Sequence, residues 1–303
     1  MSFLNLIRYQ NLIIIAAMQV FVKYGLFEAL EVQLALNNFQ FSLLVIATVC
    51  IAAAGNVIND IYDVEIDQVN KPSKVIIGKR ISEKSSNYIF IVLNVVGVGA
   101  GFYLSNTINK PAFATLFILI SASLYLYASY LKGILLIGNL LISMLVAASI
   151  LIVGFFDILP AINTDEMDLQ VIVLKVLLHY SLFAFLINFI RELVKDLQDI
   201  NGDKNGGMNT LPIAIGRKRA TYFVFILGVL MVISIVIYMY AYLYHHQAMV
   251  LYFLFLIVAP LLYFCIKTWD AATKNDYAFL SLLLKICMLL GMSSILLYKF
   301  VVV

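Results

Sequence analysis

Charged residues are scarce in this chain of 303 residues, at 12%, whereas hydrophobic residues make up 63%. The mean hydropathy is +1.00. A water-soluble domain has no way to hide that much apolar side chain, so the composition excludes a soluble globular protein and indicates a polytopic membrane protein. The net charge of +3 is too small to argue for nucleic acid as a partner.

Cysteine is also rare, and the N-terminus lacks the features of a cleaved signal peptide. The three cysteines, Cys50, Cys265 and Cys287, lie far apart inside apolar runs, without the spacing of a metal site or a disulfide framework. We interpret them as small residues that face lipid or the core. Arg8 precedes an apolar run, but no small-residue cleavage site follows, so we expect a retained first membrane span.

Long hydrophobic runs are what the sequence has in abundance. A helix needs ~20 apolar residues to cross the hydrocarbon core of a bilayer, and that length predicts nine spans. We therefore expect an all-α membrane protein in which residues 1–303 form a single transmembrane domain. The predicted spans, separated by turn residues, are 10–34, 41–66, 86–106, 112–131, 133–157, 169–196, 219–243, 248–268 and 277–299.

Lysine and arginine are unevenly distributed among the predicted loops. The tail before the first span and the even-numbered loops hold most of the twenty basic residues, whereas the odd-numbered loops hold Lys110 alone. The loop from Asp157 to Asp168 carries acidic charges only. The positive-inside rule then predicts a cytoplasmic N-terminus and cytoplasmic even-numbered loops, and nine spans place the C-terminus outside.

An acid-rich stretch from Gly55 to Gly78 ends the second predicted span. If the helix continues through it, Asn59, Asp63 and Asp67 are four residues apart and share one face. Because crowded carboxylates repel one another, a cation has to hold them, and a divalent metal with oxygen ligands is the economical choice. The alternative is a solvated helix end at the membrane surface.

A second acidic cluster ends the sixth predicted span. Asp196, Asp199 and Asp203 repeat the spacing of Asp60, Asp63 and Asp67, and each cluster precedes a basic loop on the predicted cytoplasmic side. The match predicts a weak internal repeat, with two four-helix halves and a ninth helix appended. Two facing carboxylate clusters surrounded by Lys and Arg predict a site where Mg²⁺ bridges carboxylates to a polyanion. With an apolar bundle behind it to accept a tail, that polyanion would be a prenyl diphosphate.

At these residues the sequence resembles the UbiA superfamily of intramembrane prenyltransferases. The first family motif stands here as Asn59, Asp63 and Asp67, followed by the Asn-x-Pro element at Asn70, and the second runs from Asp196 to Lys204. The pattern REL-x-KD-x2-D-x2-GDK most resembles the digeranylgeranylglyceryl phosphate synthase branch. The resemblance implies nine helices around a central cavity. It also implies Mg²⁺-dependent transfer of a prenyl group, best assigned as geranylgeranyl, to a lipophilic acceptor, best assigned as geranylgeranylglyceryl phosphate.

The resemblance also implies roles for individual residues. The metal ligands would be Asn59, Asp60, Asp63, Asp67, Asp196, Asp199 and Asp203, among which Asp63, Asp67, Asp199 and Asp203 would be catalytic. The prenyl diphosphate and acceptor would contact Arg8, Asn11, Asn56, Lys71, Lys74, Tyr127, Lys132, Asn139 and Lys204. An allylic cation could be stabilised by the rings of Tyr62, Tyr127 and Tyr130. No catalytic base is evident.

The sequence departs from the family pattern at two positions, and several interpretations have alternatives. Tyr9 replaces the proline expected after Arg8, and Lys74 stands where arginine is usual, which loses a bidentate fork on phosphate. Asn56 could instead be an interhelical hydrogen-bonding residue. The acceptor could be an aromatic quinone, haem or chlorophyll precursor. A cation-coupled transporter would also use intramembrane carboxylates, although both clusters are predicted at one membrane face and not at the midplane.

Overall fold

The computed structural model describes residues 2–298, which form helices joined by short connections. Nine helical segments in this range are long and apolar enough to cross a membrane, which confirms the predicted number and the all-α class. The predicted end of the last span at residue 299 and the predicted outer position of the C-terminus fall outside the described residues.

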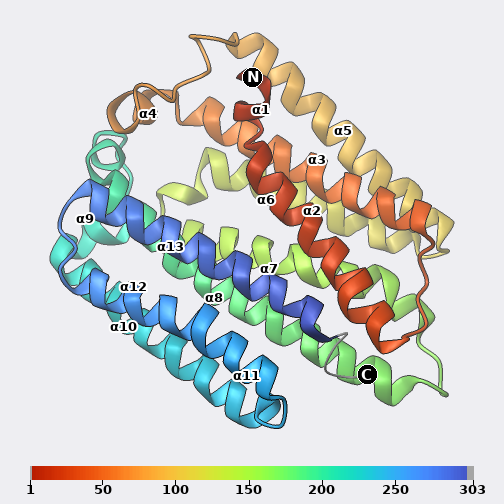
Figure 1. Ribbon diagram of the computed structural model, residues 1–303. Coiled ribbons are helices and arrows are strands. Elements are labelled where there is room, and N and C mark those ends of the chain that lie inside the picture. Colours follow the sequence, from red (N-terminus) through yellow and green to blue (C-terminus); the bar gives the residue numbers. More distant parts are fainter. Residues whose placement is uncertain (1, 299–303) are drawn as a thin grey trace.

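Mostly short connections join the nine spans, which follow one another along the chain (Figure 1). The first span continues α2 through a π-helical turn to Leu30, and the eighth joins α11 to α12 in the same way. The principal helices are α2 (Tyr9–Val20), α3 (Asn38–Tyr62), α5 (Glu83–Thr107), α6 (Ala114–Ser129), α7 (Ile137–Asp157), α8 (Met167–Asn205), α10 (Arg217–Tyr238), α11 (Gln247–Phe253), α12 (Ala259–Trp269) and α13 (Lys274–Ser293). Three short helices accompany them: α1 (Ser2–Leu6), α4 (Val64–Asn70) and α9 (Leu211–Ile215).

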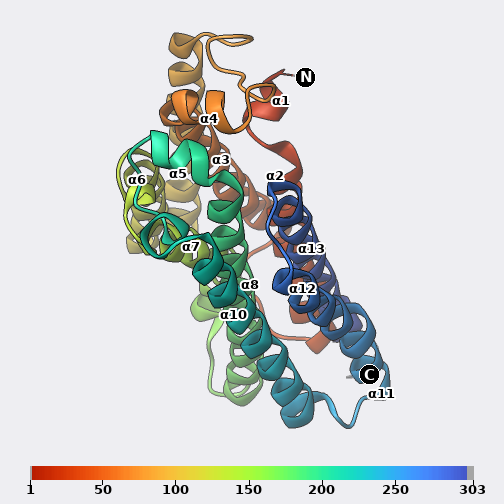
Figure 2. The ribbon, with the colours of Figure 1, turned by 90° about the vertical axis from the view of Figure 1, so that its left-hand side faces the viewer.

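The long helix α8 belongs to two separate groups of buried side chains. Val173 and Leu177 pack in a cluster with residues of α2, α3, α6 and α7, whereas Ile190 and Leu193 pack in a cluster with residues of α10, α12 and α13. In the turned view, α8 lies between α7 and α13, against both of which it packs (Figure 2). Side chains on α8 can therefore face the space that both sets enclose. The predicted repeat of two four-helix halves stays a prediction.

The helices that carry the two acidic clusters end differently from the prediction. Helix α3 ends at Tyr62, and Asp63 joins it to α4, yet the backbone ladder continues because Asp67 N donates to Asp63 O at 2.8 Å. Helix α8 does not end at residue 196 but runs on to Asn205, so its whole acidic cluster lies on one continuous helix. Hydrophobicity marks where a helix leaves the hydrocarbon core, and a helix that continues into the aqueous layer gives no such signal.

A buried ion pair links helices at the end of the bundle away from α4. Lys23 Nζ lies 2.8 Å from Asp157 Oδ2, and the two side chains are 2% and 0% exposed. The same ammonium donates to the carbonyl oxygen of Leu36 at 2.8 Å, and Asp157 Oδ1 accepts the Leu36 N–H at 2.8 Å. These contacts fasten the segment between α2 and α3 to the end of α7. From the sequence alone, no partner or position could be predicted for Lys23, which lies inside the first predicted span.

Candidate active site

The first acidic cluster lies at the junction of α3 and α4, where two cations from other segments reach it. Arg8, at the kink between α1 and α2, places Nη2 2.6 Å from Asp60 Oδ1. Lys132, in the turn before α7, forms an ion pair with Asp63, whose other carboxylate oxygen accepts Asn59 Nδ2 at 2.7 Å. Arg8 adopts a left-handed backbone with φ of 53°, which is costly for a residue with a Cβ and brings its side chain to the acids.

The second acidic cluster follows one stripe of α8. Asp196 Oδ2 accepts a hydrogen bond of 2.9 Å from Asn139 Nδ2 on α7, and Asp199 forms an ion pair with Lys71 at the end of α4. Asp203 is buried one turn further on. Asp196 and Asp199 are therefore each held by a residue that lies far away in the sequence, as expected for a site assembled by folding.

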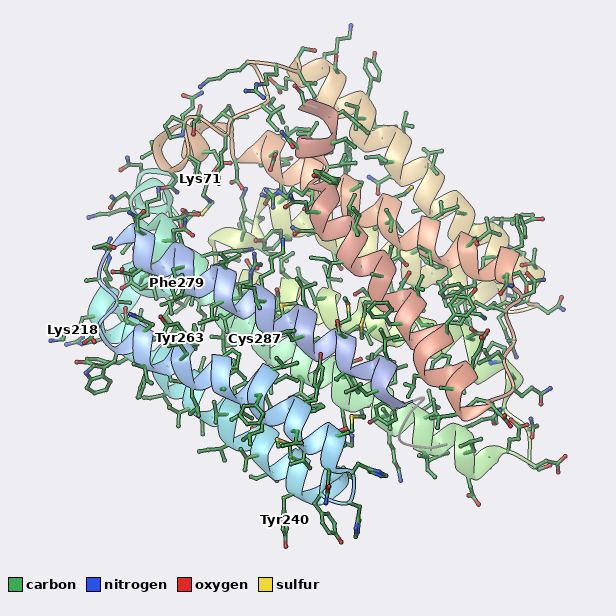
Figure 3. The ribbon with its side chains drawn as sticks, viewed as in Figure 1. Lys71, Lys218, Tyr240, Tyr263, Phe279 and Cys287 are labelled. Carbon is green, nitrogen blue, oxygen red and sulfur yellow. The ribbon has the colours of Figure 1, made fainter. Side chains whose placement is uncertain are left out.

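The two clusters meet, because α4 packs against the end of α8. Asn70 Oδ1 accepts the backbone N–H of Gly202 at 2.9 Å, and Asn70 Nδ2 lies 3.5 Å from Asp203 Oδ1. Lys71, which pairs with Asp199, is labelled at this end of the molecule in Figure 3, where α4 and α9 also lie. One ligand at this end could thus contact carboxylates of both motifs.

Burial and neighbouring charge shape the ionisation of groups that lie outside the spans. Burial raises the pKa of Asp67 above its ordinary value, and the nearby carboxylates of Asp63 and Asp60 raise it further against the opposing effect of Lys71. Burial alone would lower the pKa of Arg8, but the charge and hydrogen bond of Asp60 raise it above the ordinary arginine value. Arg8 is therefore a permanent cation, and an added metal cation would favour ionised Asp67.

The donor atoms present suit a hard divalent cation such as Mg²⁺. Asn59 Oδ1 and Asp199 Oδ1 are buried and have no hydrogen-bond partner within the described residues. Orphaned oxygen acceptors of this kind are costly unless something binds them. No three acidic, histidine or cysteine side chains of residues 2–298 converge as a ready-made metal cage. Mg²⁺ does not require such a cage, since it is commonly held by one or two carboxylates together with phosphate oxygens and water.

A cavity of about 360 Å³ opens beside the acidic clusters. Its polar part includes Arg8, Asn11, Asn56, Asn59 and Tyr127, all of which were predicted from the sequence. Its remaining wall is largely apolar and extends along α8 as far as Tyr180, with further side chains from α2, α3, α6, α7, α10 and α13. Charged groups at one end of an apolar chamber suit a ligand with an anionic head and a hydrocarbon tail.

Some of the predicted ligand residues lie at the margin of this arrangement. Lys74 is exposed but borders a small pocket with Asp60 and Asp67. Lys204 is also exposed and lines neither pocket described here. Asn56 lines the cavity and also donates to Ile7 O at 3.0 Å, so it has the interhelical role that was the alternative for it.

Two of the three tyrosines predicted to face an allylic cation do not reach the cavity. Tyr62 and Tyr130 are exposed on the outside of the helices, and the Tyr62 hydroxyl lies 3.2 Å from that of Tyr125. Tyr127 alone of the three lines the cavity. Position near a motif in the sequence could not distinguish the inner from the outer face of these helix ends.

Four charged residues that line the cavity had no assigned role. Glu192 Oε1 accepts Lys195 Nζ at 2.6 Å and lies 3.6 Å from Arg191 Nη1. Lys285 on α13 donates to Asn11 Oδ1 at 2.9 Å. The sequence did carry a signal for Arg191, Glu192 and Lys195. They lie within two or three turns of Asp196 and Asp199 on the same helix, on neighbouring stripes of its surface. Lys285 is alone in an apolar run, where an ionisable residue usually faces an interior.

Comparison with known proteins gives a consistent result. Residues 20–300 match the UbiA prenyltransferase family. The chain is 31% identical over 275 residues to a digeranylgeranylglyceryl phosphate synthase of Methanococcoides burtonii, covering 91% of this chain and 90% of the relative. It is 33% identical over 233 residues to a protein of the same name from Saccharolobus solfataricus, covering 77% and 75% of the two chains.

Solved structures share the fold over nearly the whole chain. A structure of digeranylgeranylglyceryl phosphate synthase superposes with a TM-score of 0.60 at 28% identity, covering 99% of this chain and 96% of that one. A UbiA homologue from Aeropyrum pernix gives 0.66 at 16% identity, covering 94% and 97% of the two chains. A UbiA homologue from Archaeoglobus fulgidus, solved with DMAPP and Mg²⁺, gives 0.57 at 15% identity and covers 98% and 99%. The nine-helix arrangement is therefore that of these proteins.

Proposed function

Because the chain belongs to the UbiA prenyltransferase family, we propose that it transfers a geranylgeranyl group from its diphosphate to geranylgeranylglyceryl phosphate, in ether-lipid synthesis. The enzyme class follows from the family, and the names of the relatives support the choice of acceptor. The single observation that carries the proposal is the meeting of two carboxylate clusters, with cations between them, at the polar end of an apolar cavity.

Mg²⁺ would be held between the two motifs by oxygen donors. The ligands that we assign are Asn59, Asp60, Asp63, Asp67, Asp196, Asp199 and Asp203, and the unpartnered oxygens of Asn59 and Asp199 support this choice. When bound, Mg²⁺ supplies positive charge that stabilises the departing diphosphate. The Mg²⁺ present in a UbiA homologue from Archaeoglobus fulgidus is in keeping with this assignment.

In the structure, the basic side chains of the site form ion pairs with the carboxylates. Once the diphosphate is bound, they would contact its oxygens instead. Lys71 and Lys132 each pair with an aspartate that we assign to the metal, and Arg8 does the same. With the carboxylates held by bound metal, Arg8, Lys71 and Lys132 would be free to donate to diphosphate oxygens, where negative charge builds up as the C1–O bond breaks. Lys74, exposed beside Asp60 and Asp67, and Lys204 would add to this positive surface.

The apolar cavity holds the prenyl chain so that C1 lies near Tyr127 at the polar end. The ring of Tyr127 stabilises the allylic cation by cation–π attraction, which is worth roughly 0.5–2 kcal/mol in general. The acceptor hydroxyl attacks C1 as the diphosphate leaves, and its proton passes to an aspartate of the cluster or to the diphosphate. Exclusion of water by the apolar wall protects the cation from hydrolysis.

The catalytic end of the protein would face the cytoplasm. The basic residues that flank both acidic motifs support this orientation through the positive-inside rule. Soluble diphosphate would then be released into the compartment from which charged substrates arrive. The whole described chain would act as one transmembrane domain.

An acceptor competition tests the proposed reaction. Purified protein receives labelled geranylgeranyl diphosphate and Mg²⁺ together with equal amounts of geranylgeranylglyceryl phosphate and a hydroxybenzoate, and the product masses are measured. We expect one main product, the glyceryl phosphate with two geranylgeranyl chains. A prenylated aromatic product would instead show that the acceptor is aromatic. Ion flux in proteoliposomes without any prenyl transfer would instead support a transporter.

A further inference from the structure

A second charged layer lines the cavity, deeper than the carboxylates of the two motifs. Of the five charged side chains that line the cavity, Arg8, Arg191, Glu192, Lys195 and Lys285, four are cations. Arg8 is already paired with Asp60. Arg191 and Lys195 share one acidic partner, Glu192, whereas Lys285 forms no ion pair within residues 2–298, so the cavity lining has an excess of positive charge.

These three cations converge from two helices that face each other. Arg191 and Lys195 lie one turn apart on α8, and Lys285 projects from α13, which packs against α8. Arg191 Nε donates to the carbonyl oxygen of Ser281 on α13 at 3.3 Å, which holds its guanidinium beside that helix. Ser281 and Lys285 are one turn apart on α13, so Arg191 and Lys285 lie near each other. Positive groups held together in a membrane interior are unfavourable unless an anion joins them.

The position of the layer separates it from the diphosphate site. Arg191 precedes Asp199 on α8 by two turns, which places its Cα atom about 12 Å deeper along the helix axis, whereas Lys195 adjoins the motif residue Asp196 and borders the diphosphate site. An acceptor whose hydroxyl attacks C1 must lie on the cavity side of the diphosphate. In a glyceryl phosphate the phosphate is only a few bonds from the attacking hydroxyl, so it falls within reach of these cations.

We propose that Arg191, Lys195 and Lys285 bind the anionic phosphate of the acceptor and thereby select a phosphorylated lipid as the second substrate. The proposal rests on the proposed function, since it assigns the acceptor half of the same site. Lys285 acts as a specificity-determining residue, held toward the cavity by its hydrogen bond to Asn11 Oδ1. Glu192 keeps Lys195 and Arg191 in place and prevents the layer from carrying too much unbalanced charge in the absence of substrate.

Direct binding of acceptors to the purified protein, without prenyl diphosphate, tests this assignment. The ligands are geranylgeranylglyceryl phosphate and the same lipid without its phosphate. We expect the phosphorylated lipid to bind at least tenfold more tightly, as for hydrogen bonds between charged groups. Lys285→Met should remove most of that preference without weakening the neutral lipid, and Lys285→Arg should retain it. Lys175→Met is the matched control, because Lys175 lies on an exposed face of α8.

Three results would overturn the proposal. The first is equal binding of the two lipids by the unmodified protein, and the second is an unchanged preference in Lys285→Met. The third is displacement of the acceptor by phosphatidylglycerol or by geranylgeranyl diphosphate, which would assign the cations to membrane lipid or to the prenyl donor. Preference for the phosphorylated lipid without any transfer in the complete reaction would support this binding site and contradict the proposed function.

Discussion

Asn70 and Gly202 fit together so closely that a Cβ atom at position 202 would collide with the Asn70 side chain. The N–H of Gly202 donates to Asn70 Oδ1 at 2.9 Å, and a Cβ added at Gly202 would come within 2.4 Å of Asn70 Cγ. Asn70 ends α4 and Gly202 lies in the last turns of α8, so this contact joins the segment after the first motif to the second motif. It sets the distance between the two acidic clusters.

We expect Gly202→Ala to lower transfer activity strongly while the protein still inserts into the membrane. The methyl group must push Asn70 away, and overpacking of this kind costs about 1–3 kcal/mol. Lys71 follows Asn70 directly, so its contact with Asp199 should weaken too. The measurement is kcat/KM for geranylgeranyl diphosphate. Gly99→Ala is the control, since a Cβ at Gly99 meets nothing within 4 Å; equal activity in the two variants would contradict the inferred role of the contact.

The second prediction concerns Asp199 as a metal ligand. Asp199→Asn keeps the size of the side chain but removes the charge, so we expect kcat to fall by about 10²–10³ or more, as when a stabilising group for developing charge is lost. Loss of the ion pair with Lys71 accompanies this change. Asp270→Asn, at an exposed position in the loop before α13, is the control and should keep its activity. Normal turnover in Asp199→Asn would exclude the assignment.

Removal of divalent metal is the third test. Because the carboxylates of both motifs are expected to reach the diphosphate through Mg²⁺, EDTA should abolish transfer and added Mg²⁺ should restore it. The structure gives a reason for the protein to stay folded meanwhile, since Lys71, Lys132 and Arg8 neutralise three of the aspartates. Thermal melting with and without EDTA should therefore differ little in the absence of substrate. Transfer that continues in EDTA would remove Mg²⁺ from the mechanism.

Sequence patterns were sufficient for the number of helices and for the meeting of the two motifs. Apolar length decides whether a segment crosses a bilayer, and acidic residues at one spacing on two helix ends point to one shared ligand. Those patterns could not show that α8 continues past Asp196, because its last turns carry polar residues that resemble a loop. Nor could they place Lys285 in the cavity and Tyr62 outside, because the direction of a side chain depends on how helices pack in three dimensions.

The partners of charged residues were the least predictable part of the site. Lys23 and Asp157 are separated by most of the first half of the chain, and Arg191, Glu192 and Lys195 looked like a cytoplasmic helix end. The resemblance to a family named Asn70 and the cations near the motifs but not the contacts that they make, such as the hydrogen bond between Asn70 and Gly202. Contacts between distant segments depend on the complete fold, which a local pattern does not encode.

Tyr180 gives a fourth prediction, on the length of the prenyl chain. It lines the deep part of the cavity, and its hydroxyl lies 2.7 Å from Ser294 Oγ, which fixes the ring there. Asp196, which we assign to the metal and diphosphate, and Tyr180 are sixteen residues apart on α8, a distance of about 24 Å. An extended chain of four isoprene units has a comparable length. We expect Tyr180→Ala to accept longer prenyl diphosphates, measured by product mass, whereas Tyr180→Phe should keep the original limit; identical chain ranges for both would contradict a limiting role.

The buried pair of Lys23 and Asp157 gives the last prediction, which concerns stability alone. Lys23→Met leaves Asp157 buried with backbone donors but no cation, and loss of one partner of such a pair costs about 3–5 kcal/mol. We expect a clear fall in the melting temperature in detergent. Replacing both residues, with Lys23→Met and Asp157→Leu, should recover part of the loss, because no buried charge is left without a partner. The pair lies at the end of the bundle away from Asp63 and Asp199, so kcat of the folded fraction should stay close to that of the unmodified protein. A double variant less stable than Lys23→Met would show that Asp157 acts chiefly through its hydrogen bond to the Leu36 N–H, and not through its charge.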